Sequence, residues 1–173
     1  MTLTAVALTV GASIVAGCAD PAPVVAGSRE RLAPGITYSA DLDGDRSFEK
    51  VLVDETAGTI TIIDGDVVYR SRDKWRVVGA YLGDTDHNGV LEVVTLLDDE
   101  DGRHLGLFAY YGGEYRERLV TSELVPRPAA LEVIKGDLIL LTLEPAEGQA
   151  GIRTLLLRWN GFSFTNVETS PAE

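Results

Sequence analysis

The chain has 173 residues, which is enough for one domain with a sizeable hydrophobic core. Hydrophobic residues make up 45% and charged residues 24%, proportions that are typical of a folded globular protein and unlike those of a disordered one. The formal net charge of −12 argues against binding to nucleic acid, because an acidic surface repels phosphate groups.

Residues 1–17 are expected to be a signal peptide. Residues 3–17 form an apolar run, LTAVALTVGASIVAG, which is shorter than the ~20 residues of a membrane-spanning helix. The run leads into VAGC at 15–18, which resembles the lipobox of bacterial lipoproteins. The resemblance implies cleavage before Cys18 and lipidation of its thiol, so that the chain is secreted and anchored to a bacterial membrane on its periplasmic or cell-surface face. Residues 1–17 lack the Lys or Arg of that pattern, and the alternative is an uncleaved N-terminal segment with a buried cysteine.

The segment after the lipobox is expected to be a tether. Residues 19–35 read ADPAPVVAGSRERLAPG, with three Pro and two Gly, a composition that favours a linker over a packed element. We therefore expect residues 18–35 to comprise the lipidated Cys18 and a flexible tether. The folded domain is predicted over 36–168, followed by a C-terminal tail at 169–173.

The domain itself reads as β-strands in a repeating pattern. Short segments rich in Val, Ile, Leu, Thr and Tyr alternate with Gly, Asp and Asn, and none keeps a helical apolar period. Asp41 and Glu49 recur 43 residues later as Asp84 and Glu92. Turn signals at Asp64-Gly65, Gly112-Gly113 and Asn160-Gly161 recur every 48 residues and predict tight hairpins. Three units of four antiparallel strands follow, at about 36–73, 74–125 and 128–168.

Four-stranded units of this length are typical of β-propeller blades. The sequence therefore predicts an all-β fold of three four-stranded antiparallel repeats that resemble such blades. Closed propellers usually have about 4–8 blades. Three units leave open a partial propeller, a ring completed by a homodimer, and a less usual closure.

Two polar loops, DLDGDRSFE at 41–49 and DTDHNGVLE at 84–92, are candidate metal sites. Each offers carboxylate or amide oxygens at positions 1, 3, 5 and 9 and a backbone carbonyl at position 7. All-oxygen sets of this kind favour Ca²⁺ over zinc, copper or Mg²⁺. The candidate ligands are Asp41, Asp43, Asp45, the Ser47 carbonyl and Glu49 in the first loop, and Asp84, Asp86, Asn88, the Val90 carbonyl and Glu92 in the second. The alternative is a pair of turns in which these side chains bond their own backbone without metal.

The loop pattern distinguishes between calcium-binding families. Position 12, the final ligand of an EF-hand, is Leu52 or Thr95 here, which excludes that motif. The pattern resembles the calcium loop of FG-GAP/VCBS repeats, the blades of integrin-like β-propellers, closely in two units and weakly in the third. Arg46 replaces the glycine expected at position 6 of the first loop, so we expect a weaker first site unless Gly44 reshapes the turn. The third unit, with LEVIKGD at 131–137, lacks the oxygen set, and no metal is expected there.

Other chemistry is sparse. His87 and His104 are the only histidines, and the sequence shows no Ser–His–Asp arrangement typical of a hydrolase. We expect His87 to lie at the surface. We expect DDEDG at 98–102 to form a hairpin turn. Aromatic residues cluster near the hairpins, where they favour packing between units or, alternatively, a sugar- or peptide-binding face. We therefore predict a non-enzymatic, calcium-binding scaffold or binding lipoprotein at the cell surface, with a protein or glycan partner. The alternative is an accessory subunit or remnant of a larger surface enzyme, adhesin or lectin-like carbohydrate-binding protein.

Overall fold

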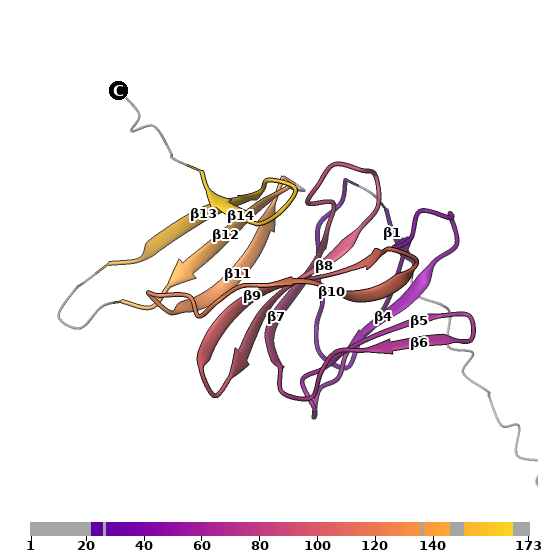
Figure 1. Cartoon of the computed structure of the whole chain (residues 1–173), viewed down its shortest axis with the longest axis horizontal. Coiled ribbons are helices and arrows are strands. Elements are labelled where there is room, and N and C mark those ends of the chain that lie inside the picture. Colours follow the sequence, from indigo (N-terminus) through magenta and orange to yellow (C-terminus); the bar gives the residue numbers. More distant parts are fainter. Residues whose placement is uncertain (1–21, 26, 136, 146–150, 168–173) are drawn as a thin grey trace, which may run out of the picture.

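Three β-sheets lie side by side in the molecule (Figure 1). The computed structural model describes residues 22–25, 27–135, 137–145 and 151–167, which form strands, turns and loops without a helix. The predicted signal peptide, Cys18 and the tail at 169–173 lie outside the described residues. The prediction of an all-β fold built from antiparallel units is confirmed, whereas the likeness to propeller blades and the closure of a ring stay predictions.

Each sheet contains four strands that are consecutive in the chain. Sheet 1 has the spatial order β1 (Pro23–Val24), β3 (Thr37–Ala40), β4 (Glu49–Val53), β5 (Ile60–Asp64) and β6 (Val67–Arg70). Sheet 2 has the order β10 (Glu114–Val120), β9 (Gly102–Tyr111), β8 (Glu92–Asp99), β7 (Arg76–Gly83) and β2 (Glu30–Arg31). Sheet 3 has the order β11 (Pro128–Ile134), β12 (Leu138–Leu143), β13 (Arg153–Trp159) and β14 (Phe164–Asn166). Apart from β1, which pairs in parallel with β3, all pairings are antiparallel.

Sheet 2 is the middle layer and is buried on both faces. Because side chains alternate along a strand, Val93, Leu97 and Phe108 face sheet 1, where they join one hydrophobic core. The intervening residues Val94, Leu96, Leu105 and Leu107 face sheet 3 and join a second core. The long apolar runs of β8 and β9 thus reflect burial on both faces of the sheet.

The segment expected to be a tether is partly folded onto the domain. β1 pairs with β3, and β2 pairs with the edge of sheet 2 at β7, so the segment spans both sheets. Leu32 is only 3% exposed and belongs to the first core. The physical reason is that Leu32 fills a buried position while the backbone groups of the stretch pair with strand edges. The folded part therefore begins at least as early as β1 rather than near Ile36.

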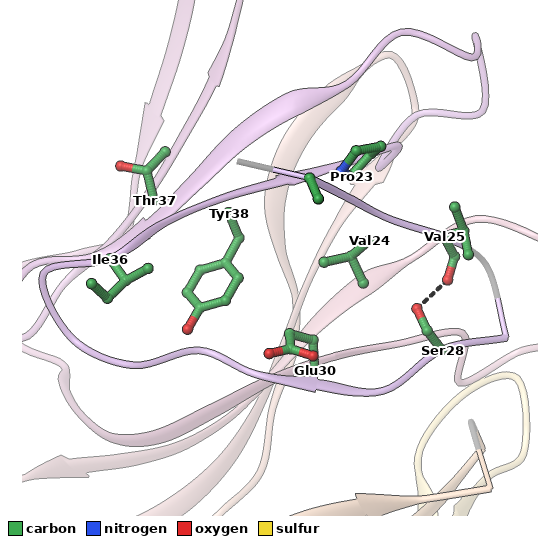
Figure 2. A pocket seen from close by; sticks show the side chains of 9 residues that line it. Pro23, Val24, Val25, Ser28, Glu30, Ile36, Thr37 and Tyr38 are labelled. Atoms are coloured by element: carbon green, nitrogen blue, oxygen red, sulfur yellow. Dashed lines mark hydrogen bonds between the residues drawn. The ribbon is translucent and has the colours of Figure 1, made fainter. Parts of the chain in front are cut away.

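A cavity of about 440 Å³ lies beside this N-terminal segment (Figure 2). Figure 2 shows Val24 and Tyr38 on opposite sides of it, with Glu30 below them. The Tyr38 hydroxyl accepts a hydrogen bond from the Ala33 backbone N–H at 3.0 Å, which holds the segment against sheet 1.

The predicted hairpins differ in detail. Tyr111 pairs with Glu114, so Gly112 and Gly113 form a two-residue turn with φ of 67° and 91°, as expected for a turn that needs positive φ at both positions. The first turn lies one residue later than predicted, because Asp64 pairs directly with Val67. The third is a wider loop, 160–163, in which the Asn160 side chain accepts N–H bonds from Phe162 and Ser163.

Candidate metal centre

The two acidic loops share one backbone path. Positions 4 and 6 have positive φ in both: Gly44 at 84° and Arg46 at 73° in the first loop, and His87 at 59° and Gly89 at 85° in the second. Each loop therefore places one glycine and one side-chain-bearing residue in the left-handed region, which costs about 1 kcal/mol for the non-glycine residue. Because both loops carry this strain, Arg46 by itself does not make the first site the weaker one.

The same hydrogen bonds close both loops. The position 1 carboxylate accepts the position 6 N–H, at 3.2 Å from Arg46 to Asp41 and at 3.1 Å from Gly89 to Asp84. The position 5 side chain accepts the position 7 N–H, at 2.6 Å in the first loop and 2.7 Å in the second. These are the side-chain-to-backbone hydrogen bonds that the metal-free alternative predicts. Each carboxylate oxygen nevertheless keeps a further lone pair that could bind a cation.

Three carboxylates of each loop converge. Asp41, Asp43 and Glu49 each bring one oxygen within 4.8 Å of the others. Asp84, Asp86 and Glu92 form the same arrangement in the second loop. Asp45 is not part of the first cluster, and its Oδ1 instead accepts bonds from the Ser47 N–H and hydroxyl, both at 2.6 Å. The contributions of Asn88 and of the Ser47 and Val90 carbonyls stay predictions.

A buried glutamate forms the floor of each cluster. Glu49 is 1% exposed and Glu92 is 2% exposed. In each, Oε2 accepts the position 2 N–H, at 2.5 Å from Leu42 and at 2.7 Å from Thr85. The other oxygen, Oε1, is buried and has no hydrogen-bond donor in the described part of the chain. A buried carboxylate oxygen without a hydrogen bond is costly, so a cation beside it would be stabilising.

The charges around the first cluster are negative. Burial, assisted by the nearby carboxylates of Asp43, Asp64 and Asp41, raises the pKa of Glu49 to about 7. Burial, with the neighbouring charges of Asp45 and Asp64, also raises the pKa of Asp43. Within the residues that the structure describes, no arginine or histidine forms an ion pair with Asp41, Asp43 or Glu49.

The second cluster has a cation of its own. Arg118, on β10, places Nη1 at 2.7 Å from Asp86 Oδ2 and at 3.5 Å from Glu92 Oε1. Burial nevertheless raises the pKa of Glu92 to about 7, in part because of the charge on Asp86. Sequence reasoning missed Arg118, because no motif near the loop points to a residue on the last strand of the sheet.

The loops also touch each other and the third unit. The Leu91 N–H donates to the Asp41 carbonyl at 3.2 Å. His87, which is exposed as expected, nevertheless has a partner, because its Nε2 lies 3.2 Å from Asp137 Oδ2. Arg158 Nε lies 3.2 Å from the same oxygen. Asp137 is the residue of the third unit that aligns with Glu49 and Glu92. Its carboxylate lies beside the side chains of His87 and Arg158.

The remaining candidates have structural surroundings. His104 packs against Trp75 with ring centroids 5.3 Å apart, and its nitrogens bond the Thr121 carbonyl at 2.9 Å and Asp99 Oδ1 at 3.0 Å. The segment at 98–102 forms the β8–β9 hairpin, with Asp99 paired to Gly102. Trp75 and Trp159 are buried in the two cores, which confirms packing between sheets as one use of the aromatic residues.

Several aromatic residues gather beside one cleft. A cleft of about 330 Å³ lies between the β9–β10 hairpin of sheet 2 and the β13–β14 hairpin of sheet 3. Tyr111, Trp159, Phe162 and Arg116 are among its lining residues. Phe162 is 86% exposed and Tyr111 is 55% exposed, so their rings are available to a ligand.

Comparisons with protein-family models, with curated proteins and with solved structures found no match. In the described residues there is no helix with the length and apolar character needed to cross a membrane. In the described residues, the geometry shows two clusters of carboxylates, each with a buried glutamate and each able to hold a metal ion.

Proposed function

We propose that the chain is a calcium-binding, non-enzymatic binding or scaffold module, anchored to a bacterial membrane through a lipid on Cys18. The observation that carries the proposal is the pair of carboxylate clusters, each with a buried glutamate oxygen that forms no hydrogen bond among the described residues. Within each cluster, the glutamate and two aspartates each bring one carboxylate oxygen close to the other two.

The ligand chemistry supports Ca²⁺ in particular. The candidate ligands are oxygens, the hard donors that Ca²⁺ and Mg²⁺ prefer over the nitrogen and sulfur donors of zinc sites. Ca²⁺ binds oxygens at about 2.3–2.6 Å, so opposite ligands lie up to about 5 Å apart, whereas Mg²⁺ spans about 4 Å. Oxygens that lie within 4.8 Å of one another are close enough for one ion to contact all three, and a set of several protein oxygens suits Ca²⁺, because Mg²⁺ usually keeps several waters.

The ion would have a structural role in this proposal. Each loop leads directly into a central strand, β4 or β8, and the two loops are joined by the Leu91–Asp41 backbone bond. A divalent cation would neutralise carboxylates that now repel one another and would fix both loops at the boundary of sheets 1 and 2. Extracellular calcium modules bind at about 10⁻⁴–10⁻³ M, so even modest sites would be filled outside the cell.

The test is a calorimetric titration of the chelator-treated chain with CaCl₂, together with melting curves with and without Ca²⁺. We expect heat of binding and a higher melting temperature with Ca²⁺. The double variant Glu49→Gln/Glu92→Gln is expected to lose both effects. Glu100→Gln, which removes one charge from an exposed turn, is the control and is expected to behave as the wild type. A wild-type chain that neither binds Ca²⁺ nor melts higher in its presence would refute the proposal.

A second candidate function, carbohydrate binding, is favoured by the cleft between sheets 2 and 3. Exposed aromatic rings beside Arg116 suit a sugar, whose apolar faces stack on rings and whose hydroxyls accept hydrogen bonds. A glycan array with the wild type should then show binding that Phe162→Ala abolishes. Ile152→Ala is a matched control because Ile152 is 84% exposed and is not among the residues that line the cleft. Equal signals from all three proteins, or none from the wild type, would exclude this candidate.

A further inference from the structure

Arg118 lies at an irregularity of β10 that directs its side chain. In the β9–β10 pairing, Glu117 is opposite Phe108 and Leu119 is opposite Leu107, so Arg118 is an extra residue without a partner. A bulge of this kind bends a strand and redirects the side chains around it. As a result, Arg118 and Leu119 both reach toward sheet 3, where Arg118 lies over Trp159 and Leu119 packs against the second core.

The guanidinium of Arg118 has two sets of partners. On one side it contacts Asp86 at 2.7 Å and Glu92 at 3.5 Å, both of which are carboxylates of the second cluster. On the other side it lies 5.3 Å from the centre of the Tyr111 ring and 5.0 Å from that of Trp159. With only 17% of its side chain exposed, it is an internal cation rather than a surface charge.

The first cluster has no equivalent contact among the described residues. Glu49 Oε1 is buried without a donor, and the charges that most affect the Glu49 carboxyl belong to Asp43, Asp64 and Asp41. The two clusters share one loop geometry, but only the second has a guanidinium among its described contacts, which already partly neutralises it.

We infer that Arg118 competes with Ca²⁺ for the second cluster, so that the first loop is the tighter calcium site and Arg118 sets the difference. This inference rests on the proposed calcium binding. An ion that enters the second cluster must displace a charge-assisted hydrogen bond to Asp86, whereas an ion at the first cluster displaces no such contact. This inference is the opposite of the expectation drawn from Arg46.

The displaced guanidinium has a place to go. Cation–π contacts to Tyr111 and Trp159 are already formed and do not depend on the carboxylates. When Ca²⁺ displaces the Arg118 guanidinium from the carboxylates, the guanidinium therefore keeps favourable contacts and is not left buried without a partner. Filling of the second cluster thus changes the electrostatics of the cleft that Arg118, Tyr111 and Trp159 line.

The experiment is a calorimetric titration of three full chains with CaCl₂. For the wild type we expect one tight site and one site at least tenfold weaker, a difference of about 1.4 kcal/mol. Arg118→Gln is expected to tighten the weaker site at least tenfold. Arg116→Gln removes the same charge two residues away, where the guanidinium bonds the Tyr111 carbonyl instead of the cluster, and should leave both sites unchanged.

Two further measurements assign the sites. Glu49→Gln should abolish the tight site and leave the weak one. This result would assign the tight site to the first loop and the weak site to the second. In the wild type, tryptophan fluorescence should change during the weak phase only, because Arg118 moves relative to Trp159 at that stage; this readout does not depend on a variant that folds. Two equal wild-type sites, or a weaker site that Arg118→Gln does not tighten, would overturn the inference while leaving calcium binding intact. A wild type that binds no Ca²⁺ would instead refute the proposed function.

Discussion

Replacing Gly106 with alanine would insert a methyl group between two strands of the middle sheet. Gly106 lies on β9 opposite Thr95, on the face that packs toward sheet 1. A Cβ atom there would lie 2.5 Å from Thr95 Oγ1 and 2.7 Å from Leu97 Cδ1, both far inside van der Waals contact. Thr95 and Leu97 are fully buried, so neither side chain can move into solvent.

The expected cost follows from that geometry. Extra methyl groups in a packed core destabilise by about 1–3 kcal/mol. In a domain of this size, 1 kcal/mol shifts the melting temperature by about 2–4 °C, so we expect a fall of about 2–12 °C. Thr95→Ala removes the nearer of the two obstructing atoms, so the double variant should lose less stability than the two single changes added together.

Thermal unfolding followed by circular dichroism is the assay, and Gly79→Ala is the control. Gly79 is also a strand glycine, but a Cβ there would meet only Leu131 Cβ, at an ordinary 3.9 Å. Alanine at that position should be neutral or slightly stabilising, because it restricts the unfolded chain. Equal melting temperatures for Gly106→Ala and Gly79→Ala would refute the idea that close packing, rather than backbone freedom, requires glycine at 106.

Two other predictions concern charge and anchoring. Asp98 accepts a hydrogen bond from the buried Arg103 at 2.8 Å, and this bond lowers the pKa of Asp98 below its usual value. Because the pKa of Asp98 is lower in the folded state, the stability that Asp98 contributes is present above about pH 4. That stability is lost as the pH falls further. Asp98→Asn should therefore lower stability by about 2 kcal/mol at pH 7 and flatten its acid dependence in urea titrations, whereas Asp101→Asn, in the exposed turn, should not. Cys18→Ser should abolish incorporation of labelled palmitate in a bacterial host and release the chain from the membrane fraction; an unlabelled wild-type chain would contradict lipidation.

The fold and the loops were predictable because their signals are local. Alternating apolar residues and turn glycines define strands within a few positions of one another, and the spacing of Asp84, Asp86 and Glu92 fixes their convergence within a single loop. The buried glutamate was predictable for the same reason, since position 9 both ends the loop and begins a core strand.

Long-range partners were not predictable. Arg118 meets Asp86 across 32 residues and only because a bulge redirects its side chain. His87 and Asp137 belong to different units and meet only once sheets 2 and 3 are packed. The paired segment around Leu32 was hidden by its composition, since Pro and Gly favour a linker while a single leucine is enough to fill a gap in the core.

The pairing of β1 with β3 has a consequence for how the domain would stand on a membrane. Only five residue steps separate Cys18 from Pro23, the start of β1, and at about 3.6 Å per step the chain can reach no more than about 18 Å. A free 18-residue tether would have allowed more than three times that distance. With a lipid on Cys18, the β1 edge of sheet 1 would be held close to the bilayer. Partners would then reach the domain along the membrane plane or from the side of the domain that faces away from the membrane.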